Sequence, residues 1–193
     1  MAARIEILDF KPAPGRTALG MAWLAHLDDQ TRLLAKDLEG IAPAELGWQL
    51  RPGMNTIGML LAHMAIVEVI WLNVAVKRPA DEGLVKTLGL TRDDDGMPNE
   101  QYGNQPPAKL KSRDLKYYLN LIRRARTRTK GLVCGFRDAE LSRMFLRTRR
   151  DGKRQRVSQR WILYHVAEHF SGHYGQILML RHLYRDRGRK MKG

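Results

Sequence analysis

The sequence predicts an all-α protein, a four-helix bundle with one long crossover between its second and third helices. Four segments carry apolar residues at the three- and four-residue spacing that places them on one face of a helix. Residues 80–107 are rich in Gly, Pro, Asn and Asp, which is typical of a long irregular connection. Amphipathic helices joined in this way bury their apolar faces against one another.

The first two helices are expected over residues 17–39 and 56–76. Gly40 follows the first segment, where a left-handed residue commonly ends a helix. The second segment is strongly apolar, with Asn55 as a possible cap at its start and Pro79 just beyond its end. Both segments are long enough to cross a domain of ordinary size.

Beyond the long connection, the third and fourth helices are expected over residues 112–130 and 158–184. Between them, the basic stretch 147–156 has an Asp-Gly pair at its centre, which favours a short hairpin. The last helix is the longest of the four. No internal repeat interrupts this order.

Length and composition favour a single domain over residues 1–193. The chain is 44% hydrophobic, as is usual for a soluble protein of this length. Residues 1–16 lack the apolar run of a signal peptide, and no uncharged apolar stretch of about 18 residues occurs. We therefore expect a cytoplasmic protein without membrane association. The single cysteine, Cys134, excludes a disulfide within the chain.

The positive charge is concentrated in one part of the sequence. Residues 109–160 contain 18 basic and 4 acidic residues, which accounts for the whole net charge of +14. Such a window can be a solvated face, or it can bind phosphates, nucleic acid or an acidic small molecule. Its aromatic residues do not form a known RNA-binding motif, so any nucleic-acid binding is expected to be weak and non-specific.

Three histidines follow one another at four-residue spacing in "HVAEHFSGHYG". At about 100° per residue, His169 and His173 lie within the apolar stripe of the last helix. His165 lies about 80° from His173 and about 12 Å away along the axis, at the rim. Imidazole–metal bonds of about 2.1 Å allow two histidines one turn apart to share an ion, but not two turns apart. The pair is therefore predicted to be His169 with His173.

A third histidine faces inward from the second helix by the same arithmetic. His63 stands in the middle of a stripe formed by Met59, Val67, Ile70 and Val74. Three imidazoles from two helices leave a coordination position open, as in catalytic rather than structural zinc sites. The alternative is that the three are core histidines, hydrogen-bonded to nearby backbone or carboxylate groups.

Two polar residues near the apolar stripe of the last helix are weaker candidates for the site. Gln176 lies at the edge of that stripe, near His173, where it can form a hydrogen bond to a metal-ligating histidine or to a substrate. Glu168 either faces solvent or orients a histidine of a neighbouring chain. The acidic run at residues 93–96, "DDDG", lacks the alternating spacing of a calcium loop, so we interpret it as a turn with local caps.

Three stretches of the sequence resemble the DinB-like superfamily of metalloenzymes. They are residues 27–72, the segment "TRDDDGMP", and residues 158–177, which end in "EHFSGHYGQI". The resemblance implies a four-helix bundle in which a divalent metal, usually zinc or nickel, binds a histidine of the second helix and a pair on the last. These positions fall on His63, His169 and His173, and His165 matches a recurrent position that is not a ligand.

The resemblance also implies a class of function. Some members of the wider superfamily transfer low-molecular-weight bacterial thiols or isomerise thiol adducts, others have no known reaction, and many members are dimers. We therefore expect a metal-dependent enzyme, a thiol S-transferase or a hydrolase, acting on a small molecule such as an anionic thiol. The alternatives are a non-catalytic metal-binding or scaffold protein, and a basic nucleic-acid-binding protein with structural histidines. We expect a homodimer, paired through Trp71, Leu72 and Val76 on the second helix.

Overall fold

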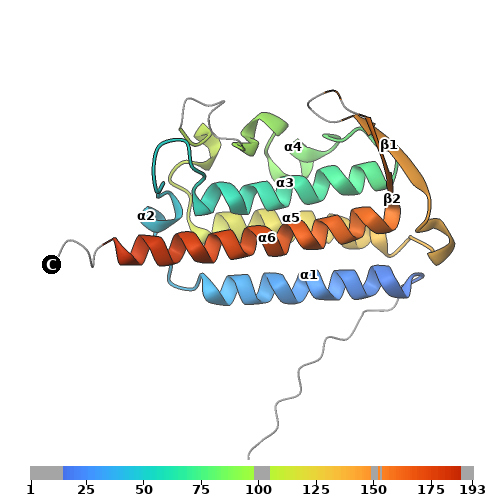
Figure 1. The fold of residues 1–193 in the computed structure, drawn as a ribbon, viewed down its shortest axis with the longest axis horizontal. Helices are drawn as coiled ribbons and strands as arrows, with labels where there is room; N and C mark the ends of the chain where they lie inside the picture. Colours follow the sequence, from blue (N-terminus) through green and yellow to red (C-terminus); the bar gives the residue numbers. More distant parts are fainter. Residues whose placement is uncertain (1–14, 98–104, 149–151, 153, 188–193) are drawn as a thin grey trace, which may run out of the picture.

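A computed structural model describes residues 15–97, 105–148, 152 and 154–187 of the chain. It is mostly helical. Its four long helices are α1 (Ala18–Asp37), α3 (Ile57–Ala75), α5 (Leu115–Val133) and α6 (Gln159–Asp186). They lie side by side, with α3 packed against α5 and α6, and α1 packed against the same two helices (Figure 1). The core lies between them.

Each long helix starts at a polar side chain that accepts a hydrogen bond from the first helical turn. The capping residues are Thr17, Thr56, Asp114 and Ser158. Each accepts from the backbone N–H three residues later, which satisfies a group that has no partner within the helix. The expectation that Asn55 caps the second helix is wrong by one residue, because Thr56 does so.

The region expected to be irregular contains short helices. Within it the structure has α4 (Leu84–Leu88) and η1 (Arg92–Asp95), and η3 (Ala108–Leu110) follows. The sequence analysis also did not anticipate α2 (Pro43–Leu46) and η4 (Asp138–Glu140). One-turn elements of this kind carry too few apolar positions for a periodicity to be visible in the sequence.

The predicted hairpin is present as the one sheet of the described residues. Strand β1 (Met144–Thr148) pairs antiparallel with β2 (Arg154–Ser158), and Gly152 between them has a φ of +78°. Asp151, the other residue of the expected turn, lies outside the described residues. The hairpin contacts α3 through β1 and leads from β2 into α6 (Figure 1), so it stands beside the helices that carry the histidines.

Helix α3 is buried on nearly every side, which corrects two expectations. Trp71 and Leu72, proposed as a surface for a second subunit, are only 7% and 0% exposed. Val67 and Ile70, on the same stripe as His63, are only half-buried and line a cavity. Because α3 is apolar all round, hydrophobic periodicity does not identify which side faces the core.

The same helix is long and apolar enough to span a membrane when judged by length and composition alone. In the folded chain, however, 78% of the segment is buried inside the protein. This is the behaviour of a core helix.

A charged pair is buried between α3 and α5. Arg126 donates from Nε to Glu68 Oε1 at 2.9 Å and from Nη2 to Oε2 at 3.1 Å, and its Nη1 reaches Asp28 Oδ1 on α1 at 3.3 Å. Burial opposes the charge on Arg126, but the charges and hydrogen bonds of Glu68 and Asp28 together outweigh it and raise the pKa of the guanidinium. This basic residue of the 109–160 window is therefore part of the core and not of a binding surface.

Candidate metal centre

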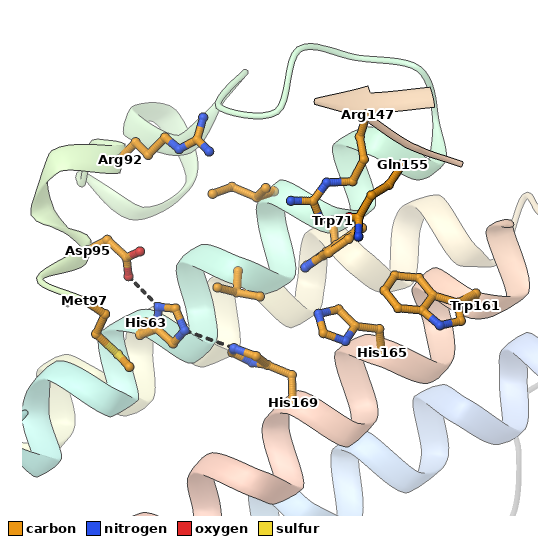
Figure 2. A pocket seen from close by; sticks show the side chains of 12 residues that line it. His63, Trp71, Arg92, Asp95, Met97, Arg147, Gln155, Trp161, His165 and His169 are labelled. Carbon is orange, nitrogen blue, oxygen red and sulfur yellow. Dashed lines mark hydrogen bonds and ion pairs between the residues drawn. The ribbon is translucent and has the colours of Figure 1, made fainter. Parts of the chain in front are cut away.

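Three histidine side chains converge between α3 and α6. The Nε2 atom of His169 lies 3.0 Å from Nε2 of His63 and 3.0 Å from Nε2 of His173. The nitrogen atoms that the three rings offer all lie within 4.8 Å of one another. Figure 2 shows His63 and His169 pointing toward each other from the two helices. The structure thus brings together the three residues that the sequence analysis selected.

Neighbouring oxygen atoms determine which ring nitrogen carries the proton in two of these histidines. His63 Nδ1 lies 2.6 Å from Asp95 Oδ1, and His173 Nδ1 lies 2.7 Å from Gln176 Oε1. A carboxylate or an amide oxygen only accepts, so in each case Nδ1 carries the proton and donates. The Nε2 atoms of both rings therefore present lone pairs to the space between the helices.

The three Nε2 atoms have too few protons between them for each short contact to be a hydrogen bond. If His169 carries a proton on Nε2, that proton can bond to only one of the two neighbouring nitrogens. The remaining nitrogen then lies 3.0 Å from His169 Nε2 without a hydrogen bond. A divalent cation would satisfy all three lone pairs at once, and the opposite ring nitrogen of a metal-binding histidine usually donates to an acceptor such as Asp95 or Gln176. The donor set therefore fits a metal ion.

Burial keeps the rings in the form that binds metal. Desolvation, followed by the neighbouring imidazoles of His63 and His173, lowers the pKa of His169 to about 2. Burial also lowers the pKa of His173, although Gln176 opposes the change. Neutral imidazole is the metal-binding form, so no proton has to leave these two rings near neutral pH.

His165 is at the rim, as expected, and is outside the group of three. Its ring is stacked on Trp161, with centroids 4.8 Å apart and an interplanar angle of 7°, and contacts Trp71 edge-on. Its Nδ1 lies 3.3 Å from Oε2 of Glu168, which is 56% exposed. Burial lowers the pKa of His165 as well. Glu168 therefore contacts a histidine of its own chain.

Asp95 is a residue of the site that the sequence pattern does not indicate. The acidic run predicts a turn, and for Asp94 this is correct, because its Oδ2 accepts from the backbone N–H and hydroxyl of Thr91 in a capping box. Asp95 instead points away from the turn to His63, and Gly96 follows with a φ of +71°. The signal for it in the sequence was that "TRDDDGMP" was one of the segments that carried the family resemblance.

A cavity of about 620 Å³ opens beside the histidines. Its walls combine aromatic, cationic and amide side chains from α3, η1, the hairpin and α6 (Figure 2). The Arg147 guanidinium lies over the ring of Trp71, 4.1 Å from the centroid. The Nε atom of Arg92 is buried and has no hydrogen-bond partner in the structure. Gln155 and Trp161 complete the end of the cavity that lies farthest from His63.

A mostly helical chain whose three histidines meet in this way beside a cavity belongs to the class of proteins with a residue group that could hold a metal ion. Residues 22–186 match the family model described as mycothiol-S-transferase, and the chain belongs to that family. The family is part of the DinB/YfiT-like superfamily, so the resemblance found in the sequence is confirmed. A search of curated proteins found no match.

Proposed function

We propose that the protein is a metal-dependent thiol S-transferase that joins the sulfur of a low-molecular-weight thiol to an electrophilic small molecule. The observation that carries this proposal is the convergence of three Nε2 atoms beside a cavity, in a member of a family named for S-transfer. His63, His169 and His173 would hold the ion. Mycothiol, the thiol in the family name, is the first substrate to test.

The contacts of each residue indicate the role that it would have in the reaction. A bound divalent metal supplies Lewis acidity, which lowers the pKa of a thiol so that thiolate is available near neutral pH. Asp95 and Gln176 keep the rings of His63 and His173 in the Nδ1–H form. In the transfer, the thiolate sulfur forms a bond to an electrophilic carbon, and the leaving group departs with the electron pair of its old bond.

The cavity walls favour a substrate with both a polar and an apolar part. Trp71 and Trp161 contribute inclined aromatic rings to the wall, whereas Arg92 and Arg147 provide positive charge on the side of η1 and the hairpin. The partnerless Nε–H of Arg92 is a donor that a substrate oxygen can satisfy. These features support a hydroxyl-rich or anionic thiol held by the arginines, with its sulfur directed to the histidines.

We propose zinc or nickel as the ion, because nitrogen donors suit both. We also propose that residues 1–193 form one four-helix bundle domain, that the protein is cytoplasmic, and that it is a homodimer. Since Trp71 and Leu72 are buried, the surface for a second subunit has to lie elsewhere. We propose instead that the second subunit packs against the exposed side chains of Met179 and Leu183 on α6. Light scattering at micromolar concentration tests this, and a monomer would contradict it.

The experiment for the function compares metal-loaded and chelated protein, purified without a histidine tag. Mycothiol and an alkyl halide are supplied, and formation of the thioether is followed. We expect turnover by the loaded protein only, and its loss in His63→Ala and His169→Ala. The matched control is His182→Ala, which removes an exposed histidine of α6. Equal turnover by chelated and loaded protein would refute the proposal.

A second measurement tests the role given to the arginines. Arg92→Gln and Arg147→Gln should raise KM for the thiol about tenfold or more, because each removes a charged hydrogen-bond donor. The metal content of both variants should equal that of the wild type, since neither residue belongs to the histidine group. Unchanged KM in both variants would show that the thiol binds elsewhere.

A further inference from the structure

A second cleft, lined largely by cationic side chains, lies between α4, α5 and the segment that follows α3. Its volume is about 670 Å³, and it shares no lining residue with the cavity beside the histidines. Five of its nine lining residues are basic: Arg78, Lys86, Arg123, Arg124 and Arg128. Three of these belong to the basic window 109–160 and are not used by the proposed function.

The positive charge of this cleft is poorly compensated. Its one acidic lining residue is Glu82, which lies 3.6 Å from Arg78. Both side chains are about half-exposed, so solvent weakens their attraction. Four cationic residues of the lining then remain for which the cleft itself provides no carboxylate.

Three of the arginines donate to neutral acceptors. Arg124 donates from Nη2 to the backbone oxygen of Leu88 at 3.1 Å, and Arg128 donates from Nη2 to Oδ1 of Asn73. Arg123 donates from Nη1 to Oδ1 of Asn120 at 2.5 Å. The amide nitrogen of Asn73 in turn donates to the backbone oxygens of Ala80 and Glu82, which ties α3 to the segment after it. These bonds orient the guanidinium groups but do not neutralise them.

Arg128 provides the observation that points to a ligand. Its Nη1 atom is buried and has no hydrogen-bond partner among the described residues. Burial, with repulsion from Arg78, lowers the pKa of its guanidinium, so the charge of Arg128 is unfavourable where it stands. A buried donor without a partner is itself unfavourable, because it has lost its bonds to water. An anion in the cleft would offset the repulsion, and a small turn of the Arg128 side chain would let Nη1 donate to it.

We propose that this cleft binds a compact multivalent anion of the phosphate class. A guanidinium group can donate two parallel hydrogen bonds to the oxygens of one phosphate, and the hydroxyl of Thr87 adds a donor to the lining. None of the described residues that line the cleft is aromatic, so they offer no ring on which a nucleotide base could stack. Inorganic phosphate chains therefore fit the lining better than nucleotides or single-stranded nucleic acid.

The test is calorimetric titration of the full chain with pyrophosphate at near-physiological salt. Wild-type protein should bind with a saturable, one-to-one signal. Arg128→Gln, which removes the partnerless donor, should raise Kd about tenfold or more, and so should Arg123→Gln on the exposed side of the cleft. The matched control is Arg137→Gln, which removes an exposed arginine of the same basic window outside the cleft.

Three outcomes would overturn the proposal. Absence of saturable binding by the wild type would refute it, and an equal loss in Arg137→Gln would reduce the effect to net charge. Tighter binding of duplex DNA, lost in the same two variants, would make the cleft a nucleic-acid interface instead. If Arg128→Gln fails to fold by circular dichroism, Arg123→Gln decides, because that residue is exposed. Metal content and S-transfer should not change in Arg123→Gln.

Discussion

Asp95 offers the sharpest test of the metal centre, because the structure, and not the sequence, selected it. Its Oδ1 lies 2.6 Å from His63 Nδ1, and the two side chains are only 7% and 13% exposed. Removing such an outer partner of a ligating histidine lowers metal affinity about 10- to 100-fold. This corresponds to about 1.4 to 2.8 kcal/mol of binding free energy.

Two substitutions of Asp95 should reduce metal affinity by different amounts within that 10- to 100-fold range. In Asp95→Asn an amide oxygen can still accept from His63 Nδ1–H but carries no charge, so the loss should be near tenfold. In Asp95→Ala no acceptor remains and the His63 ring is free to turn, so the loss should approach 100-fold. Competition for zinc against a coloured chelator near neutral pH measures both values.

The control is Asp93→Asn, which removes an exposed carboxylate from the same short helix. It should bind zinc as the wild type does. Thermal unfolding of the metal-free proteins shows whether a change in affinity is only a change in stability. If Asp95→Ala binds zinc as tightly as the wild type while remaining folded, then Asp95 does not support the ligand and the tautomer argument fails.

Three further predictions follow from the same structure. His165→Ala should keep nearly all its zinc after dialysis against a mild chelator, whereas His173→Ala should lose most of it. The opposite result by elemental analysis would mean that His165, and not His173, binds the ion together with His169. Glu68→Ala should lower the free energy of unfolding in urea by about 3 kcal/mol, because it leaves the buried charge of Arg126 with only the part-exposed Asp28, at 3.3 Å, as a partner. A loss of less than about 1 kcal/mol would mean that the pair behaves like an exposed one. The lowered pKa values of His169 and His173 should keep zinc bound at about pH 6, where a free imidazole of pKa about 6.5 is mostly protonated. Zinc release that already begins above that pH would contradict this.

Local sequence was sufficient to locate the long helices and two of the histidines. Helix caps and the three- to four-residue periodicity depend on neighbours within one or two turns. The predicted segment 56–76 therefore differs from α3 by one residue at each end. The same periodicity placed His169 and His173 on one face of α6, one turn apart, and kept His165 apart from them.

The selection of His63 from the sequence had a weaker basis than the selection of His169 and His173. Its stripe was predicted to face the core, yet Val67 and Ile70 on that stripe line the cavity, whereas Leu72 is fully buried. Helix α3 is apolar on all sides, so its sequence contains no information on its rotation about its axis. The resemblance to a family, and not the periodicity, was the stronger support for this residue.

The sequence by itself thus determined the long helices, the charge distribution and the placement of His169 and His173 on one helix face, because these depend on short-range order. The tertiary structure decided what lies around them. Asp95 reaches His63 across 32 positions of the chain, and Arg128 reaches Asn73 across 55. Such contacts depend on how helices pack and on where the connecting turns direct their side chains, and no local pattern encodes either. For that reason the carboxylate beside His63, the cavity walls and the cationic cleft became visible only in the folded chain.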